Sequence, residues 1–151
     1  MKTKNAPTLT VVPTVKKSVF AFKTRPVIAA NGLQKGIFVG VINETPENGD
    51  EFNRVVVTVE LETMDGKGNR FVVKKDYNIL PNGRGFSAFI EDYNAWSDAG
   101  FTENDLYIEH DYDVLFKGKP VIVEVEHRKN GSEWEAVIVA FHPVGTEALA
   151  A

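Results

Sequence analysis

Residues 120–143, PVIVEVEHRKNGSEWEAVIVAFHP, decide the fold class of this chain. Val121, Val123 and Val125 lie two apart, which is the period of a strand with one buried face. The pair Asn130-Gly131 follows, and it favours a tight hairpin turn because both residues tolerate a positive φ. The apolar residues beyond the turn predict a return strand. We therefore expect an antiparallel hairpin in the C-terminal part of the chain.

A second hairpin is predicted upstream of the first. Residues 54–62, RVVVTVELE, place valine and leucine on one face of a strand and threonine and glutamate on the other. Residues 70–79, RFVVKKDYNI, predict the return strand, and the intervening residues 65–69, DGKGN, are a turn signal. Residues 36–42 form a shorter apolar strand, in which Gly40 indicates a bulge or a tight bend.

One helix is expected between the two hairpins. Apolar residues recur there at intervals of three and four, which is typical of a helix with one buried face. This stripe consists of Phe86, Phe89, Ile90, Tyr93 and Trp96. Gly100 is well placed to end the helix.

Five curved strands with a helix between the third and the fourth follow the order of an OB-fold barrel. The sequence therefore predicts a mainly β protein with an OB-like five-stranded barrel, and a plain α+β sheet with the same elements is the alternative. We expect residues 1–17 to be a flexible basic arm rich in threonine and proline, residues 18–143 to be a single β domain and residues 144–151 to be a short tail.

The composition is that of an ordinary one-domain protein. The chain has 151 residues, of which 43% are hydrophobic and 25% charged. It contains no cysteine, which excludes disulfides and thiolate chemistry. No stretch approaches the roughly 18 apolar residues of a membrane span, and the N-terminal lysines precede no apolar segment of signal-peptide type. We expect a cytoplasmic protein without membrane contact.

The charge of the chain is divided unevenly. Residues 1–43 contain seven lysine or arginine side chains and no aspartate or glutamate, whereas the remaining residues hold all 21 acidic side chains. Lysine and arginine release counterions from a polyanion, so the basic stretch is suited to phosphate binding. The alternative is a solvated segment that keeps the protein soluble.

Catalytic and metal sites have little support in the sequence. His110, His127 and His142 lack the close spacing of a metal-binding pair, and no cysteine can complete a zinc site. No serine lies in a nucleophile motif. The glycine-rich residues 82–85, NGRG, could hold a phosphate before the helix, or they could simply connect a strand to it. We expect no enzyme, no cofactor and no metal.

Binding of single-stranded nucleic acid agrees best with the distribution of basic and aromatic residues. Such a site needs basic groups along a curved sheet and aromatic rings on which bases stack. Alternation along the strand places Lys75 on the face of Tyr77 and Lys74 on the opposite face. The predicted contact residues are Arg54, Arg70, Lys74, Lys75 and Tyr77 on the central hairpin, Arg128, Lys129 and Trp134 on the last hairpin, and Arg84, Lys16 and Lys17 elsewhere.

The last hairpin carries a family resemblance. Residues 115–128, LFKGKPVIVEVEHR, followed by Asn130-Gly131 and a strand to Phe141, resemble the C-terminal hairpin of a group of small phage-encoded proteins. Residues 33–38, LQKGIF, and residues 55–69 also resemble the first strands of these proteins. Members are described as single-stranded DNA-binding or DNA-replication accessory proteins with an OB-like barrel.

The resemblance implies sequence-tolerant binding of single-stranded DNA, or of RNA, in phage or plasmid DNA replication or recombination, by a homo-oligomer. The alternative is a structural or interaction protein. In that case the basic arm would dock on an acidic surface of a partner or of a second copy, such as residues 103–113. Clustering of the basic residues with Tyr77 and Trp134 would favour nucleic-acid binding. Scattering of the basic residues would favour a structural or interaction protein.

Overall fold

The computed structural model describes residues 18–20, 27–44, 53–80 and 85–146. Its strands are β1 (Gly32–Asn43), β2 (Asn53–Met64), β3 (Arg70–Ile79), β4 (Pro120–Asn130) and β5 (Glu133–His142). Its helices are α1 (Phe86–Ser97), the short 3-10 helix η3 (Glu103–Tyr107) and α2 (Tyr112–Phe116). The predicted mainly β class, both hairpins and the helix between the third and fourth strands are confirmed.

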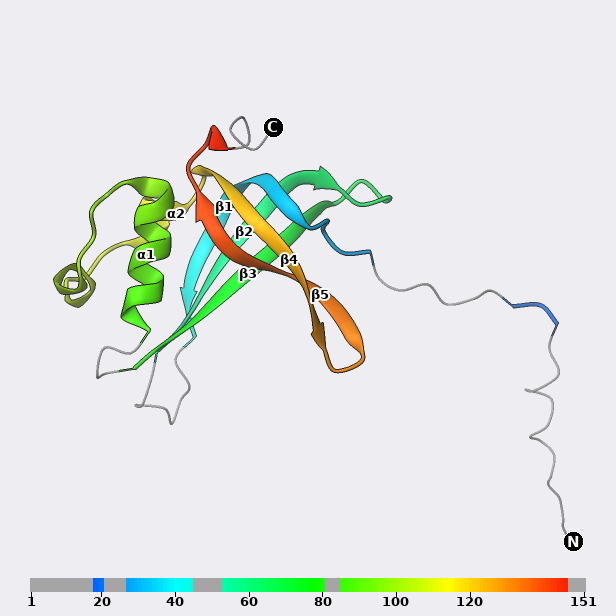
Figure 1. Cartoon of the computed structure of the whole chain (residues 1–151), viewed down its shortest axis with the longest axis horizontal. Helices are drawn as coiled ribbons and strands as arrows, with labels where there is room; N and C mark the ends of the chain where they lie inside the picture. The colour runs from blue at the N-terminus through cyan, green and yellow to red at the C-terminus, as the bar shows by residue number, and fades with distance from the viewer. Residues whose placement is uncertain (1–17, 21–26, 45–52, 81–84, 147–151) are drawn as a thin grey trace, which may run out of the picture.

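The strands form one antiparallel sheet in the order β3-β2-β1-β4-β5. In the described part of the chain the hydrogen-bonded sheet is open, with β3 and β5 as its two edges. Figure 1 shows a strongly curved sheet with α1 and α2 on one side, while the β2–β3 and β4–β5 hairpins extend away from the helices. No helix in the described residues is long and apolar enough to cross a membrane.

Strand β1 joins the two hairpins. Its first half, from Gly32 to Ile37, pairs with β4, and its second half, from Gly36 to Asn43, pairs with β2. The strand therefore begins four residues earlier than the apolar pattern predicts. The register shifts between Phe38 and Gly40, which confirms the predicted bulge.

Close approach of β2 explains the glycine at position 36. A Cβ atom on Gly36 would lie 2.7 Å from the Glu60 carbonyl oxygen and 2.7 Å from a methyl group of Val59. Any larger residue would push the two strands apart at the point where β1 exchanges partners.

The turn of the last hairpin lies one residue later than expected. Asn130 pairs with Glu133, so Gly131 and Ser132 form the two-residue loop. Among residues 130–132, only Gly131 has a positive φ, of 67°, which matches a II′-type turn with glycine in the first loop position. The register places Lys129 opposite Trp134.

Aromatic side chains from the helices complete the core. Phe89 and Tyr93 of α1 are buried, and Trp96 packs on Phe38 of β1 with ring centroids 4.5 Å apart. Phe116 of α2 contacts Phe38 edge-on at 5.1 Å. Helix α1 ends at Ser97, before Gly100, because Asp98 takes the left-handed conformation that terminates it.

Candidate nucleic-acid interface

A groove of about 480 Å³ separates the two edge strands of the sheet. Lys74 and Asp76 of β3 line one wall, and Arg128 and Glu135 of the β4–β5 hairpin line the other. The floor is mostly apolar and includes Val73, Ala136 and Ile138. The groove is therefore open and holds a cation on each wall, each accompanied by a carboxylate.

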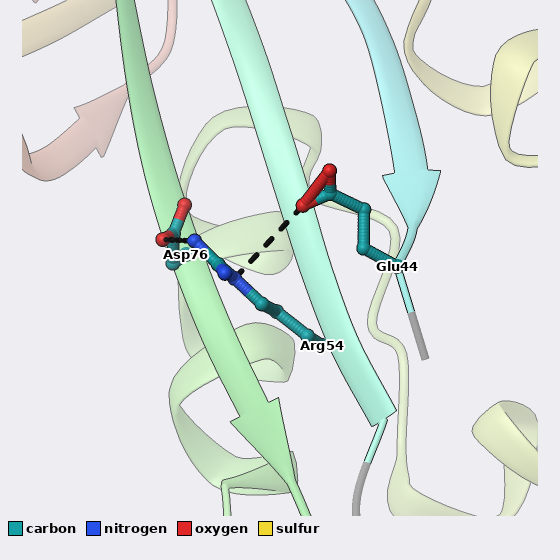
Figure 2. Close-up of polar contacts among 3 residues, drawn as sticks. All are labelled: Glu44, Arg54 and Asp76. Carbon is teal, nitrogen blue, oxygen red and sulfur yellow. Dashed lines mark hydrogen bonds and ion pairs between the residues drawn. The ribbon is translucent and has the colours of Figure 1, made fainter. Parts of the chain in front are cut away.

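Arg54, at the start of β2, is already engaged by two carboxylates. Its Nη2 lies 2.6 Å from an Asp76 oxygen on β3, and its Nε lies 3.9 Å from a Glu44 oxygen beyond the end of β1. Figure 2 shows the guanidinium between the two acids. The hydrogen bond with Asp76 raises the pKa of Arg54, so this side chain stays charged but its charge is compensated.

Tyr77 and Lys75 face inward from β3. Tyr77 is only 5% exposed, and its ring lies edge-on to Phe89 with centroids 5.2 Å apart. Its hydroxyl donates to Asp92 of α1 at 2.5 Å, and the Lys75 ammonium group pairs with the same oxygen at 2.6 Å. Burial raises the pKa of Tyr77, and the charge of Asp92 raises it further.

These contacts bear on two of the predicted contact residues. A base cannot stack on Tyr77 in this structure, because the ring lies in the core. The charge of Lys75 is compensated by Asp92, although the residue also lines the groove. Alternation correctly placed the two on one face, but that face is the interior.

The remaining basic residues of β3 are solvent-exposed. Arg70 lies opposite Met64, beside the β2–β3 turn, and Lys74 lies opposite Thr58. Within the described residues neither side chain makes an ion pair. Four residues along a strand span about 13 Å, so Arg70 and Lys74 form a spaced pair of uncompensated cations on β3.

The β4–β5 hairpin presents two different faces. Lys129 and Trp134 lie opposite each other on one face, and Arg128 and Glu135 lie opposite each other on the other. Trp134 is 48% exposed, as expected for a residue near the turn. Arg128 also lies 3.7 Å from a Glu126 oxygen, so its charge is partly offset. The hairpin thus separates its tryptophan from its groove-lining arginine.

Several exposed apolar side chains on β1 and β3 were not predicted. Ile37, Val39, Ile42 and Val72 are each between 40 and 56% exposed. Ile37 and Val72 flank Glu60 of β2 in one row of the sheet. For the three residues of β1 there was no such signal in the sequence, because alternation cannot show which face of the continuous apolar run 37–42 meets solvent.

Three of the predicted contact residues lie in parts of the chain that the structure does not describe. Arg84, Lys16 and Lys17 lie outside the described residues. The basic residues that are placed cluster only in part: Lys74 and Arg128 share the groove, Lys129 accompanies Trp134, and Arg54 and Lys75 are held by acids. In the described part of the chain no group of histidine and acidic residues could hold a metal ion.

No protein-family model matches the chain, and no curated protein matches it. The described residues on the outside of the sheet include the spaced cations Arg70 and Lys74, the half-exposed indole ring of Trp134 and several exposed aliphatic side chains.

Proposed function

We propose that this chain is an OB-like barrel that binds single-stranded nucleic acid, foremost DNA, with little sequence preference. The strand order β3-β2-β1-β4-β5 and the helix between β3 and β4 support the OB-like assignment. In such folds the face of the second and third strands and the loop between the last two strands bind oligonucleotides. Here these regions carry Arg70 and Lys74, and Lys129 and Trp134.

The observation that carries the proposal is the groove between β3 and β5. Lys74 and Arg128 are distant in the sequence but lie on opposite walls of this groove. A cation on each side of a channel suits a polyanionic backbone running along it. Asp76 and Glu135 in the same groove reduce the positive potential, so we expect moderate affinity that weakens steeply with salt.

Trp134 is the residue best placed to stack on a base. Its ring is half exposed and lies opposite Lys129, so a base on the indole would have a cation beside its phosphate. Stacking tolerates any base, because every base has a π face. This is the physical basis for expecting little sequence preference.

The process and the assembly are inferred from the resemblance of the last hairpin. We propose a role in phage or plasmid DNA replication or recombination, carried out in the cytoplasm by a homo-oligomer. Binding, not catalysis, is the proposed activity. Coating of exposed single strands would require only the surface described above.

Fluorescence anisotropy tests this function. A labelled single strand of about 30 nucleotides is longer than the 4–16 nucleotides that one OB fold covers, and it would be compared with the matching duplex and with RNA. We expect a preference for the single strand and, for three to five phosphate contacts, a log–log salt slope of about −2 to −4. Equal affinity for duplex, or no binding at low salt, would overturn the proposal.

A second candidate function is favoured by the charge of the helical layer. Residues 86–116, which include α1, η3 and α2, contain eight acidic side chains and no lysine or arginine. Such a surface is complementary to the basic residues 1–43 of a partner or of a second copy. Salt-sensitive self-association measured by light scattering, in a protein that binds no single strand, would support this structural role instead.

A further inference from the structure

The groove between β3 and β5 is walled by the backbones of two strand edges. Its lining includes residues 72–76 of β3 and residues 135–138 of β5 in unbroken succession. Because side chains alternate between the two faces of a strand, consecutive residues line one groove where the backbone itself forms the wall. In the described part of the chain no backbone hydrogen bond joins β3 to β5. Each edge therefore presents main-chain donors and acceptors to the groove.

The register of the last hairpin identifies the groups of β5 that face the groove. Residues that flank a two-residue loop form a hydrogen-bonded pair, and such pairs alternate with non-bonded pairs along an antiparallel ladder. Asn130 and Glu133 flank the loop. By alternation, Val137 lies in a bonded pair, whereas Ala136 and Ile138 lie in non-bonded pairs. Ala136 and Ile138 thus direct their N–H and C=O groups away from β4, toward the groove.

These main-chain groups have no other partner in the described residues. Outside the strand ladder, no hydrogen bond in the described part of the chain reaches the backbone of Ala136 or Ile138. Ile138 is only 3% exposed, so bulk water has little access to its backbone. A main-chain group withheld from water costs free energy unless it finds a partner. The groove therefore offers hydrogen bonds that a ligand with suitable donors and acceptors would complete.

The cations lie at the rim of this groove and the apolar side chains lie at its floor. Val73 is buried, whereas its neighbour Lys74 and, on the other wall, Arg128 are exposed. A nucleic-acid strand whose phosphates contact Lys74 and Arg128 would direct its bases inward, toward Ala136 and Ile138. The rim and the walls of the groove thus suit two different parts of a nucleotide.

Unpaired bases carry the groups that complement a strand edge. Every base has a hydrogen-bond donor next to an acceptor on its Watson–Crick edge, and these edges are accessible in single strands. Ala136 and Ile138 each offer an N–H beside a C=O, so either residue suits any of the four bases. In a duplex the same edges are occupied by the opposite strand. Contact through the backbone would therefore favour single strands without selecting a sequence.

We propose that the free edge of β5 at Ala136 and Ile138 hydrogen-bonds the Watson–Crick edges of bases that lie in the groove. The inference rests on the proposed function and deepens it, because it names main-chain groups as base contacts. It also supplies a physical reason for excluding duplex. These contacts need no particular side chain, so the basic and aromatic residues of the sequence do not reveal them.

Amide hydrogen exchange in the full chain, measured by NMR with and without saturating oligo-dT, tests the contact. We expect the amides of Ala136 and Ile138 to exchange several-fold more slowly when oligo-dT is bound. The amide of Glu103, at the start of η3 in the helical layer, is the control and should be unaffected. Unchanged exchange at Ala136 and Ile138 in the bound protein would overturn the proposal.

A modified strand separates base contacts from phosphate contacts. An oligonucleotide of N3-methylthymidine keeps the phosphates and the ring faces but lacks the donor on the Watson–Crick edge. We expect it to bind about 2- to 10-fold more weakly than oligo-dT, the range for one neutral hydrogen bond. It should also protect the Ala136 amide less. Equal affinity and equal protection for the two strands would show that the bases are not bound through this edge.

A proline substitution removes the donor from the protein side. Ala136→Pro deletes an N–H that faces away from β4, and an edge strand tolerates proline at such a position. Binding of oligo-dT should weaken about 2- to 10-fold with an unchanged salt slope, because no phosphate contact is lost. Ala136→Gly is the matched control, since it removes the side chain and keeps the N–H. If circular dichroism shows that Ala136→Pro is unfolded, the exchange and the modified strand decide in the wild type.

The outcomes for the two proposals differ. If the wild type binds oligo-dT but its Ala136 and Ile138 amides are not protected, the edge contact is wrong and the proposed function stands. If the wild type does not bind oligo-dT at low salt, the proposed function fails, and the edge contact with it. Protection at both amides that is reduced with the methylated strand supports both proposals.

Discussion

The ammonium group of Lys75 on β3 lies 2.6 Å from a carboxylate oxygen of Asp92 on α1, with both side chains less than a quarter exposed. The same oxygen accepts a hydrogen bond from the Tyr77 hydroxyl. The carboxylate of Asp92 thus links helix α1 to the edge strand β3 and satisfies two polar groups that lie between the sheet and the helix.

Asp92→Asn should destabilise the fold. The substitution leaves the Lys75 charge without its partner in a partly desolvated position, and we expect a loss of about 1–3 kcal/mol in the free energy of unfolding. Urea denaturation followed by tryptophan fluorescence measures this loss. Glu91→Gln is the matched control, because Glu91 is the exposed neighbour on the same helix; equal effects of the two variants would contradict the role of Asp92.

Because Tyr77 is buried, we expect the free energy of unfolding to decline at alkaline pH. Burial, and then the charge of Asp92, raises the pKa of Tyr77 in the folded state. Above about pH 10 the unfolded chain loses the phenolic proton and the folded chain keeps it. The contribution of the Tyr77 hydroxyl to the free energy of unfolding is therefore complete below about pH 10. Above this pH it falls by up to about 1.4 kcal/mol for each pH unit.

Stability measured against pH in Tyr77→Phe isolates this effect. The variant should lose the part of the alkaline decline that Tyr77 causes, although its stability at neutral pH is lower. Tyr107→Phe changes an exposed tyrosine and should reproduce the wild-type profile. Parallel profiles for wild type and Tyr77→Phe would show that Tyr77 does not titrate differently in the two states.

Alternation and turn chemistry predicted most of the sheet, because both are local. They could not show that the face shared by Lys75 and Tyr77 is the interior, since that depends on where α1 packs. The hairpin turn was misplaced by one residue because Asn130 and Gly131 both suit a turn, and only pairing across the strands selects Gly131-Ser132. The contacts of His127 with Ala29 and Asn31 had no sequence signal, since these partners lie nearly a hundred residues away from it.

Gly36→Ala should weaken the junction of the two hairpins. The added methyl group would lie 2.7 Å from a β2 carbonyl oxygen and from a β2 valine, and such overpacking costs about 1–3 kcal/mol. Gly66→Ala, in the β2–β3 turn, is the control, because nothing lies within 4 Å of its added methyl group. Thermal unfolding should separate the two variants clearly, and similar melting temperatures would argue against close packing at position 36.

Substitution of Trp134 should weaken binding through the loss of base stacking. Trp134→Ala removes the stacking surface, and we expect a loss of about 1–3 kcal/mol in binding free energy with an unchanged salt slope. Tyr107→Ala removes an exposed aromatic ring on the acidic helical layer and should have no effect on binding. A loss of the same size in both variants would point to a nonspecific cause.

Lys74→Gln should instead weaken the electrostatic attraction between the protein and the phosphates of the strand. Its charge is uncompensated in the described part of the chain, so its loss should make the log–log salt slope shallower by about 0.7, the value for one phosphate contact with a single strand. Arg54→Gln is the comparison, because Asp76 and Glu44 already offset that charge. Its removal leaves Asp76 and Glu44 unpaired, so repulsion at low salt should also lower affinity, but no phosphate contact is lost. A loss of affinity that persists at moderate salt in Lys74→Gln and disappears there in Arg54→Gln would identify the groove, and not the end of β2, as the path of the backbone.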